Sequence, residues 1–503
     1  MRTDHWALRA LLPVLVLAMA GTASAGPVVQ TQTGAIEGIS ERAGVESFLG
    51  VPFAAPPVGE RRWRAPLPPT PWRGVRSATA FSRDCIQEPQ SVPPGPGFNN
   101  PTSEDCLYLN IWRPAQAAAT PLPVMVWIYG GAFIMGAGSF PSYDGAMFAR
   151  GGVILVTFNY RLGRFGTFAH PALTREQVGG PIGNYGIMDQ VAALKWVRAN
   201  IAAFGGDPAN VTIFGESAGA RSVNILMASP AARGLFAKAV AQSGGGGSTL
   251  HSVATAEAAG TAWAEKHGAE SLAALRALPP EAVWDGPVRG GPVLVEDGQL
   301  IAMATDEAFR TGAVADVPYI NGFNSQEESL LRWLPDAAER WFAGLDAAGQ
   351  GLLALYAEAG TDRRVALGRL WGEANYGVSS RARAHGVAAR GGRAWLYRYA
   401  YVPDAAGGTA SGAGHEAEIE MVFANPDPRW TAPWSAADAD MARTVQGYWL
   451  NFARTGDPNG AGLPPWPAYG ADDDVLMGFD ARGAAAVRGF GKARFDAIEA
   501  IKP

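Results

Sequence analysis

The chain has 503 residues, of which 48% are hydrophobic, and its formal net charge at pH 7 is -5. A chain of this length and apolar content can bury a large core, in one domain or in two or three smaller ones. The acidic balance is not that of a nucleic-acid-binding protein, so that function class is excluded.

The first 25 residues are typical of an export signal. A positively charged start precedes an apolar run at 10–20, and small residues up to Ala25 provide a cleavage site. The run is shorter than the ~20 residues that span a bilayer and contains Pro13, and no later segment is long and apolar enough. We therefore expect cleavage near Ala25 and a secreted or periplasmic protein without a stable membrane anchor.

The two cysteines of the chain are Cys85 and Cys106. In the oxidising compartment that an export signal implies, they are expected to form one disulfide. This bond would close the loop 86–105, which is too rich in Pro and Gly to hold itself in regular structure. No cysteine precedes Cys85, so a lipid-modified amino terminus is excluded.

Short apolar runs rich in β-branched and aromatic residues alternate with helical stretches. These runs lie at 123–129, 153–160, 211–214, 237–243, 317–323 and 394–400. Nearly continuous hydrophobicity predicts strands covered on both faces, as in a mostly parallel sheet. Between them, segments such as 186–204 place apolar residues at helical spacing. The pattern predicts an α/β fold with a central sheet.

Gly-Glu-Ser-Ala-Gly at 215–219 lies where one of these runs passes into helix-compatible sequence. This context predicts a nucleophile elbow, a sharp strand-to-helix turn that presents Ser217 to a substrate. The flanking glycines leave room for the strained turn. The amide of Ala218, at the start of the helix, then faces a forming oxyanion. The alternative is a passive serine in a glycine-rich loop.

Further oxyanion donors are predicted directly after the strand at 123–129. Gly130, Gly131 and Ala132 are small enough for their amides to approach a substrate carbonyl. By itself the glycine pair is typical of an ordinary loop. Together with the elbow, an oxyanion hole is the better interpretation.

A nucleophilic serine needs a base, and the chain has six histidines. Five of them lie in the signal, upstream of the elbow, or in polar or alanine-rich stretches that look like ordinary surface. These are His5, His170, His251, His267 and His385. His415 differs, because it lies on a Gly-rich loop ahead of an apolar helical run, where an imidazole can reach a sheet edge.

The third member of a triad orients the imidazole and stabilises its charged form. Glu327 and Glu328 follow a predicted strand and lie between Ser217 and His415 in the chain. The order serine, acid, histidine is that of an α/β-hydrolase. Either glutamate is also typical of a solvated helix start. The residues alone do not choose between the two.

Seven blocks follow one another along the chain, at 48–66, 103–114 (SEDCLYLNIWRP), 126–136, 156–169, 183–220, 241–245 and 449–459. In this order they resemble the signatures of the type-B carboxylesterase and cholinesterase group of α/β-hydrolases, closest to its bacterial carboxylesterases. The resemblance covers nearly the whole mature chain. Beyond the signal peptide expected at 1–25, it implies a single α/β-hydrolase domain at 26–503, with inserted loops and helices around the active site.

The resemblance also implies roles for particular residues. It assigns the triad to Ser217, Glu327 and His415, the oxyanion hole to Gly131, Ala132 and Ala218, and the family's first disulfide to Cys85 and Cys106. The chain departs from the family pattern at Glu328 and Glu416, where relatives usually carry glycine. The implied reaction is two-step acyl transfer to water on a small ester, without a metal or an organic cofactor.

Departures from the family pattern also bear on the substrate. Cholinesterases hold a tryptophan in the loop that this disulfide closes, where it binds a quaternary ammonium by cation-π attraction. Here the only aromatic residue of that loop is Phe98, which disfavours a choline ester. The four glycines at 244–247 predict a roomy acyl pocket. Glu216 is expected to support the triad through buried hydrogen bonds.

Two other functions remain as alternatives. Family members that lost the nucleophile act in adhesion or binding, but the intact Ser217, Glu327 and His415 argue against this function. An interfacial lipase needs a large apolar lid, which nothing in the sequence demands. We expect a monomer or a weak homo-oligomer with no nucleic-acid partner.

Overall fold

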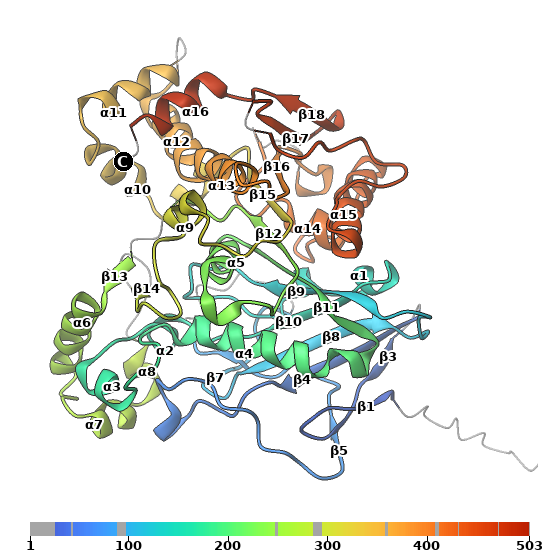
Figure 1. Ribbon diagram of the computed structural model, residues 1–503, viewed down its shortest axis with the longest axis vertical. Helices are drawn as coiled ribbons and strands as arrows, with labels where there is room; N and C mark the ends of the chain where they lie inside the picture. The colour runs from blue at the N-terminus through green and yellow to red at the C-terminus, as the bar shows by residue number, and fades with distance from the viewer. Residues whose placement is uncertain are drawn as a thin grey trace, which may run out of the picture.

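The computed structural model shows one large sheet with helices packed around it (Figure 1). It describes residues 26–41, 44–87, 97–246, 250–284, 294–357, 361–407, 412–430, 432–470 and 472–501. The expected signal segment, 1–25, lies outside the described residues, as does Gly247 of the glycine run.

Within the described residues, the main sheet has eleven strands in the order β18-β17-β16-β15-β12-β11-β9-β10-β8-β4-β3. These strands are β3 (Ile39–Glu41), β4 (Val45–Pro52), β8 (Tyr108–Pro114), β9 (Leu122–Ile128), β10 (Ile154–Phe158), β11 (Gly206–Glu216), β12 (Lys238–Gln242), β15 (Tyr319–Asn324), β16 (Ala394–Tyr399), β17 (Val475–Asp480) and β18 (Gly483–Arg488). From β10 across to β17, neighbouring strands are parallel. The remaining pairs are antiparallel. The expected α/β fold with a mostly parallel central sheet is confirmed.

The six strands expected from the sequence are all present, but the sheet continues beyond them on both sides. The additional strands are β3, β4, β8, β17 and β18. Continuous apolar runs predict central strands, which are covered on both faces. The outer strands mix apolar residues with small and charged ones, and β18 is largely exposed. Their weaker pattern explains why the sequence did not predict them.

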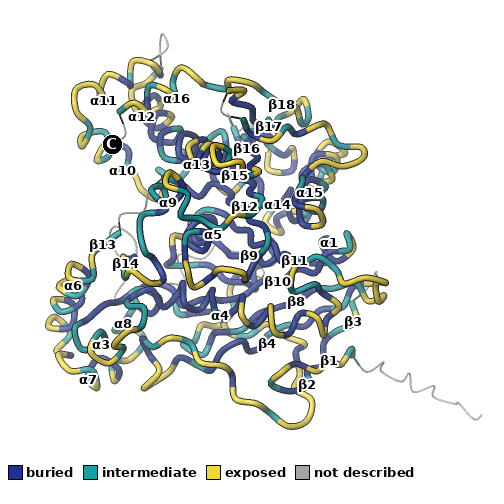
Figure 2. Tube along the Cα trace, in the orientation of Figure 1, coloured by how far each residue is buried: buried dark blue, intermediate teal, exposed yellow. Residues whose placement is uncertain are grey.

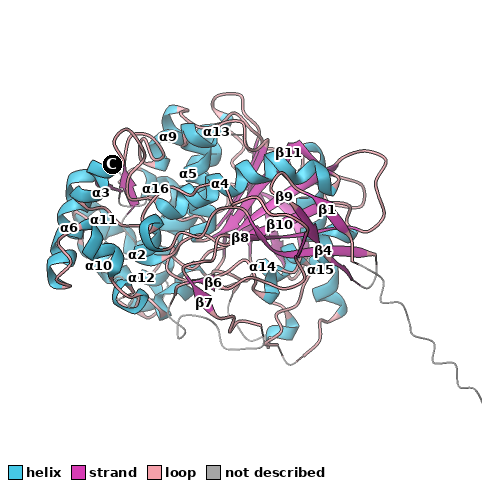
Figure 3. Cartoon of the chain, turned by 90° about the horizontal axis from the view of Figure 1, so that it is seen from below, coloured by secondary structure: helices cyan, strands magenta, loops and turns pink. Residues whose placement is uncertain are grey.

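The core lies along the central strands. Every residue of β10, β12 and β15 is buried, and Figure 2 shows this as a dark band through the middle of the molecule. Figure 3 shows α4 and α5 on one side of the sheet and α14 and α15 on the other. Both faces of the central strands are therefore shielded from water, which their continuous hydrophobicity requires.

The α-helices differ widely in length and surround the sheet. They are α1 (Ala146–Arg150), α2 (Gly163–Gly166), α3 (Pro171–Glu176), α4 (Tyr185–Asn200), α5 (Ala218–Ala228), α6 (Val253–Lys266), α7 (Leu272–Ala277), α8 (Pro280–Val283), α9 (Thr305–Thr311), α10 (Ala337–Ala343), α11 (Ala347–Gly351), α12 (Arg363–Gly372), α13 (Val378–Ala388), α14 (Ile419–Phe423), α15 (Ala436–Thr455) and α16 (Lys492–Glu499). Within the described ranges, no helix has the length and apolar character needed to cross a membrane.

The parallel direction of the central strands brings chemistry-bearing residues together. Gly130 follows β9, Ser217 follows β11, Ser243 follows β12 and Glu327 lies three residues beyond β15. The carboxyl ends of parallel strands meet at one edge of a sheet, where α/β proteins place their ligand sites. Four segments that are distant in the sequence therefore meet at this edge.

Cys85 and Cys106 form the expected disulfide, with their Cα atoms 5.0 Å apart. Cys85 ends the short strand β6 (Asp84–Cys85), which pairs with β7 (Thr102–Ser103). The bond thus joins the two ends of the intervening loop next to β8. Both cysteines are buried.

Candidate active site

Ser217 lies at a sharp turn between β11 and α5. Its backbone angles are φ 54° and ψ -120°, a region that residues other than glycine rarely adopt. The amide of Ser217 donates a 2.9 Å hydrogen bond to the carbonyl of Gln242, which ties the turn to the end of β12. The strand-turn-helix context expected from the sequence is present, although β11 extends to Glu216 and is longer than the predicted run.

The two glycines around Ser217 allow α5 to begin directly against the end of β9. A Cβ atom on Gly219 would lie 1.9 Å from the carbonyl oxygen of Ile128, and one on Gly215 would lie 2.5 Å from the same atom. Neither position has room for a larger residue. The glycines of this motif thus reflect close packing of the helix on the neighbouring strand.

The loop after β9 approaches the elbow from the other side. A Cβ atom on Gly130 would lie 3.1 Å from Cβ of Ser217. Gly131 and Ala132 both have positive φ angles, of 90° and 53°. Among the described residues, the amides of Gly131 and Ala132 donate no hydrogen bond to a protein group. The amide of Ala218 opens α5, where the helix dipole is positive. Gly131 thus directly follows a residue that lies against the elbow, and Ala218 directly follows Ser217.

His415 pairs with Glu327 on the other side of the elbow. His415 Nδ1 lies 2.5 Å from Oε2 of Glu327, and both side chains are buried. The second carboxylate oxygen of Glu327 accepts hydrogen bonds from the hydroxyl of Ser243, at 2.7 Å, and the amide of Asn324, at 2.6 Å. Both oxygens of the carboxylate are thus held in place, which orients the imidazole.

Contacts with the sheet hold the loop that carries His415. The amide of His415 donates to the Ser329 hydroxyl at 2.9 Å, and the side-chain amide of Asn324 donates to the His415 carbonyl at 2.8 Å. The loop leads into α14, where the ring of Phe423 packs 5.0 Å from the ring of Trp127 in β9. The histidine therefore depends on the strands that also carry the elbow and the glycine loop.

The electrostatics of the site depend on burial and on several carboxyl groups. Burial by itself lowers the pKa of His415, but the charge of Glu327 and the hydrogen bond to it outweigh burial and raise this pKa. His415 Nε2 lies 3.2 Å from Oε1 of Glu216, and neither atom has a hydrogen-bond partner in the described structure. Burial, together with repulsion from Glu416 and other nearby glutamates, raises the pKa of Glu216 well above its ordinary value.

The remaining described histidines lie elsewhere. His170 caps α3, with its Nδ1 accepting a hydrogen bond from the amide of Ala172. His251 lies in β13 (Leu250–Ser252), His267 at the end of α6, and His385 on the exposed side of α13. Of the described histidines, only His415 is paired with a buried carboxylate.

A family model described as the carboxylesterase family matches residues 25–340 and 347–496. The chain belongs to the carboxylesterase family. It is 36% identical to the fumonisin B1 esterase of Sphingopyxis macrogoltabida over 478 residues, which cover 89% of this chain and 86% of the relative. It is also 36% identical to the para-nitrobenzyl esterase of Bacillus subtilis over 474 residues, which cover 88% and 92%.

Solved structures agree with this assignment. A PNB esterase structure superposes with a TM-score of 0.81 at 31% identity, covering 95% of this chain and 99% of that one. The Geobacillus stearothermophilus carboxylesterase Est55 superposes with a TM-score of 0.81 at 34% identity, covering 93% and 99%. The protein is therefore a carboxylic-ester hydrolase with the α/β-hydrolase fold that the sequence predicted.

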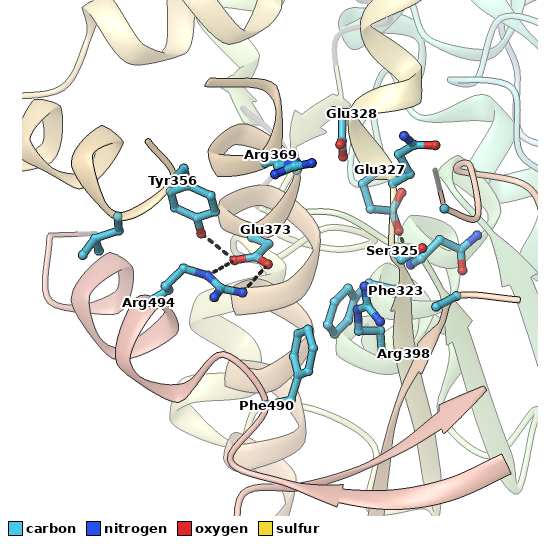
Figure 4. Close-up of a pocket in the computed structure, with 16 residues that line it drawn as sticks. Phe323, Ser325, Glu327, Glu328, Tyr356, Arg369, Glu373, Arg398, Phe490 and Arg494 are labelled. Atoms are coloured by element: carbon cyan, nitrogen blue, oxygen red, sulfur yellow. Dashed lines mark hydrogen bonds and ion pairs between the residues drawn. The ribbon is translucent and has the colours of Figure 1, made fainter. Parts of the chain in front are cut away.

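The structure of this carboxylesterase separates the two neighbouring glutamates. Both line a cavity of about 420 Å³ together with Arg369 and Arg398 (Figure 4), but of the two only Glu327 pairs with His415. Burial raises the pKa of Glu328. Glu328 also lies against α12, where a Cβ atom on Gly372 would be 3.3 Å from its Oε2. The residue that fills the family's glycine position thus faces away from the imidazole.

Several residues around the site of the carboxylesterase were not predicted from the sequence. Ser243 and Asn324 bind the carboxylate of Glu327, and the Tyr376 ring packs 5.1 Å from the imidazole of His415. Ser243 was detectable, because it is the last residue of the run predicted as a strand at 237–243. Tyr376 carried no such signal, since it comes from the π-helical segment Glu373–Gly377 between α12 and α13.

Proposed function

We propose that this carboxylesterase cleaves its ester through a Ser217, His415 and Glu327 triad and an acyl-enzyme intermediate. The observation that carries the proposal is the buried contact of 2.5 Å between His415 and Glu327 beside the Ser217 turn. A nucleophilic serine requires a base whose tautomer and orientation are held by an acid, and this pair supplies both.

In the first half of the reaction, His415 Nε2 takes the proton of the Ser217 hydroxyl as Oγ attacks the ester carbonyl. The amides of Gly131, Ala132 and Ala218 stabilise the negative oxygen of the tetrahedral intermediate. The imidazolium of His415 then donates its proton to the alcohol oxygen, and the carbon-oxygen bond of the ester breaks. The acyl group stays on Ser217 as a second ester.

In the second half, water replaces the alcohol. His415 accepts a proton from the water, the resulting hydroxide attacks the acyl carbon, and collapse of the second tetrahedral intermediate releases the acid and restores Ser217. Glu327 stabilises the imidazolium in both halves.

The choice of substrate class follows from what surrounds the site. The Phe98 ring is buried, packs 5.0 Å from the Phe140 ring, and has the guanidinium of Arg429 above it at 5.2 Å. Its face is therefore occupied by a cation of the protein itself, which supports the expectation that the substrate is not a choline ester. We propose small neutral or anionic esters as substrates.

We also propose that the protein is exported, with residues 1–25 removed as a signal peptide. The proposal rests on the charged start, the apolar run and the small residues up to Ala25. Amino-terminal sequencing of the protein recovered from the native host tests it. Recovery of the full-length chain from the cytoplasm would contradict export.

The decisive experiment for the mechanism compares Ser217→Ala with Ser229→Ala. Ser229 is a buried serine at the far end of α5, so its substitution controls for loss of a buried hydroxyl on the same helix. We expect a fluorophosphonate probe to label the parent enzyme and Ser229→Ala but not Ser217→Ala, and hydrolysis to follow the labelling. Full hydrolysis by Ser217→Ala would show that another group is the nucleophile.

A further inference from the structure

Arg221 lies one turn of α5 after the proposed nucleophile. Its amide donates a 2.9 Å hydrogen bond to the carbonyl of Ser217, so the two residues are in register on the helix. Residues four apart share a helix face, and helical side chains lean toward the amino end of the helix. The guanidinium of Arg221 is therefore directed back toward the reaction centre.

The charge of Arg221 is not neutralised by the residues that the structure describes. None of the ion pairs within these ranges includes Arg221, and its Nε atom is buried without a hydrogen-bond partner. Burial lowers the pKa of Arg221, the nearby Arg383 lowers it further, and Tyr376 and Asp306 raise it. Arg221 is half-buried, and a partly desolvated cation without a partner favours a ligand with negative charge.

A second arginine reinforces the positive charge. Arg383 is 2% exposed, donates a hydrogen bond to the carbonyl of Gly245, and pairs with Asp306 at 2.7 Å. Its Nη1 atom is buried without a partner. Arg221 and Arg383 therefore have one carboxylate, Asp306, near both of them, and Arg383 already binds it.

The guanidinium of Arg221 lies beside Gly245 of the glycine run. A Cβ atom on Gly245 would lie 3.4 Å from Nη2 of Arg221 and 3.3 Å from Cε1 of Tyr376. Tyr376 in turn packs against His415. Arg221, Gly245, Tyr376 and His415 are therefore successive neighbours, and they link the arginine to the imidazole.

We propose that Arg221, supported by Arg383, binds a carboxylate on the acyl part of the substrate. The preferred substrates are then half-esters of dicarboxylic acids, whose acyl group carries a free carboxylate. This inference rests on the proposed function, because it takes Ser217 as the point of attack.

The placement of charges favours the acyl part over the alcohol part. The leaving alcohol must lie at His415 Nε2, and the negative charge of Glu416 already acts on this imidazole. A carboxylate on the alcohol would be repelled there, whereas one on the acyl group reaches Arg221.

The test measures kcat/KM for three esters. Monoethyl glutarate carries a carboxylate on the acyl part, ethyl pentanoate is its neutral counterpart, and carboxymethyl pentanoate carries the carboxylate on the alcohol part. We expect the enzyme to prefer monoethyl glutarate over both others. A preference for carboxymethyl pentanoate, or for the neutral ester over monoethyl glutarate, would overturn the inference.

Variants connect that preference to Arg221. Arg221→Met should lower the ratio of kcat/KM for monoethyl glutarate to that for ethyl pentanoate by about 10 to 100-fold, the range for hydrogen bonds to charged groups. Arg221→Lys should retain part of the preference, because it keeps the charge. Arg482→Met removes an exposed arginine of the β17–β18 turn and controls for the change in net charge. An unchanged ratio in Arg221→Met would contradict the inference.

Failure of the inference is distinguishable from failure of the proposed function. Binding of glutarate to Ser217→Ala, measured by calorimetry, reports the Arg221 site without turnover, and it should weaken in the double variant with Arg221→Met. If glutarate binds Ser217→Ala equally well with and without Arg221, the inference is wrong. If Ser217→Ala still hydrolyses ethyl pentanoate, the proposed function is wrong instead.

Discussion

His415 and Glu327 lie 88 positions apart in the sequence, yet His415 Nδ1 is 2.5 Å from Oε2 of Glu327. The strand β15 delivers the glutamate to the carboxyl edge of the sheet, and the loop before α14 brings the histidine to the same edge. Both side chains are shielded from water, so the charge on the carboxylate acts on the imidazole with little screening. Catalysis should therefore depend strongly on this pair.

Substitution of Glu327 and of Glu328 should show which of the two adjacent glutamates is the acid of the triad. In Glu327→Gln the imidazole loses the charge that orients it and stabilises its protonated form, and we expect kcat for ethyl pentanoate to fall by about 10³ to 10⁴-fold. Glu328→Gln is the matched control, since it makes the same change one residue away in the neighbouring cavity. Steady-state kinetics of both variants provide the test, and a larger loss in Glu328→Gln would contradict the assignment.

The pH dependence of kcat/KM should report the raised pKa of His415. The base must be neutral to accept the serine proton, so activity falls as pH falls through the pKa of His415. Because Glu327 raises that pKa above its ordinary 6.5, the acid limb should have its midpoint above this value. In Glu327→Gln the midpoint should move to lower pH, and an unmoved midpoint would show that another group sets the limb.

We expect Ser243 to affect catalysis only through its hydrogen bond to Glu327. Removing its hydroxyl in Ser243→Ala takes away one of the two hydrogen bonds to Glu327 Oε1, and we expect kcat to fall by about 10-fold, with KM little changed. Ser380→Ala is the control, because it removes a buried hydroxyl that bonds only the carbonyl of Gly322. Equal losses of activity in both variants would indicate a general structural effect.

Gly131 should tolerate no side chain. In Gly131→Ala the new Cβ atom would meet the Met135 carbonyl oxygen at 2.2 Å, so the loop must shift and its amide donors with it. We expect kcat to fall by about 10² to 10³-fold, as when an oxyanion donor is lost. Gly152→Ala is the control, since Gly152 also has positive φ but no neighbour within 4 Å of the added carbon. Comparable activity in the two variants would argue against the oxyanion role.

The disulfide should contribute to stability. Cys85 and Cys106 are 21 positions apart, and opening a loop of that length in a Cys85→Ala, Cys106→Ala double variant should lower the free energy of unfolding by about 3 kcal/mol. Denaturant unfolding with and without a reducing agent measures this difference. The reducing agent should destabilise the parent enzyme but leave the double variant unaffected.

The fold class was predictable because its signals are local. Continuous apolar runs in β9, β10, β11, β12, β15 and β16 reflect burial on both faces, and each run is visible in the sequence without knowledge of its neighbours. The Ser217 turn is equally local, since a strand, a glycine-flanked serine and a helix follow one another directly. The edge strand β18 lacks such a pattern because none of its residues is buried.

The rest of the site depends on the direction in which each side chain points once distant segments have packed together. Glu327 and Glu328 are adjacent and chemically identical, and only the turn after β15 decides that the first, and not the second, pairs with His415. The hydrogen bond from Ser243 likewise requires two strand ends to meet. Such relationships arise from long-range packing, which residue spacing does not encode.

By itself, then, the sequence determined the sheet, the serine turn and the class of reaction, because these follow from contiguous residues and recognisable blocks. The family resemblance pointed to Glu327, but only the tertiary structure places its carboxylate against the imidazole and shows where Arg221 lies. Arg221 looks like an ordinary helical residue in the sequence. Its significance appears only when α5, the glycine run after β12 and Tyr376 enclose its charge without a partner among the described residues.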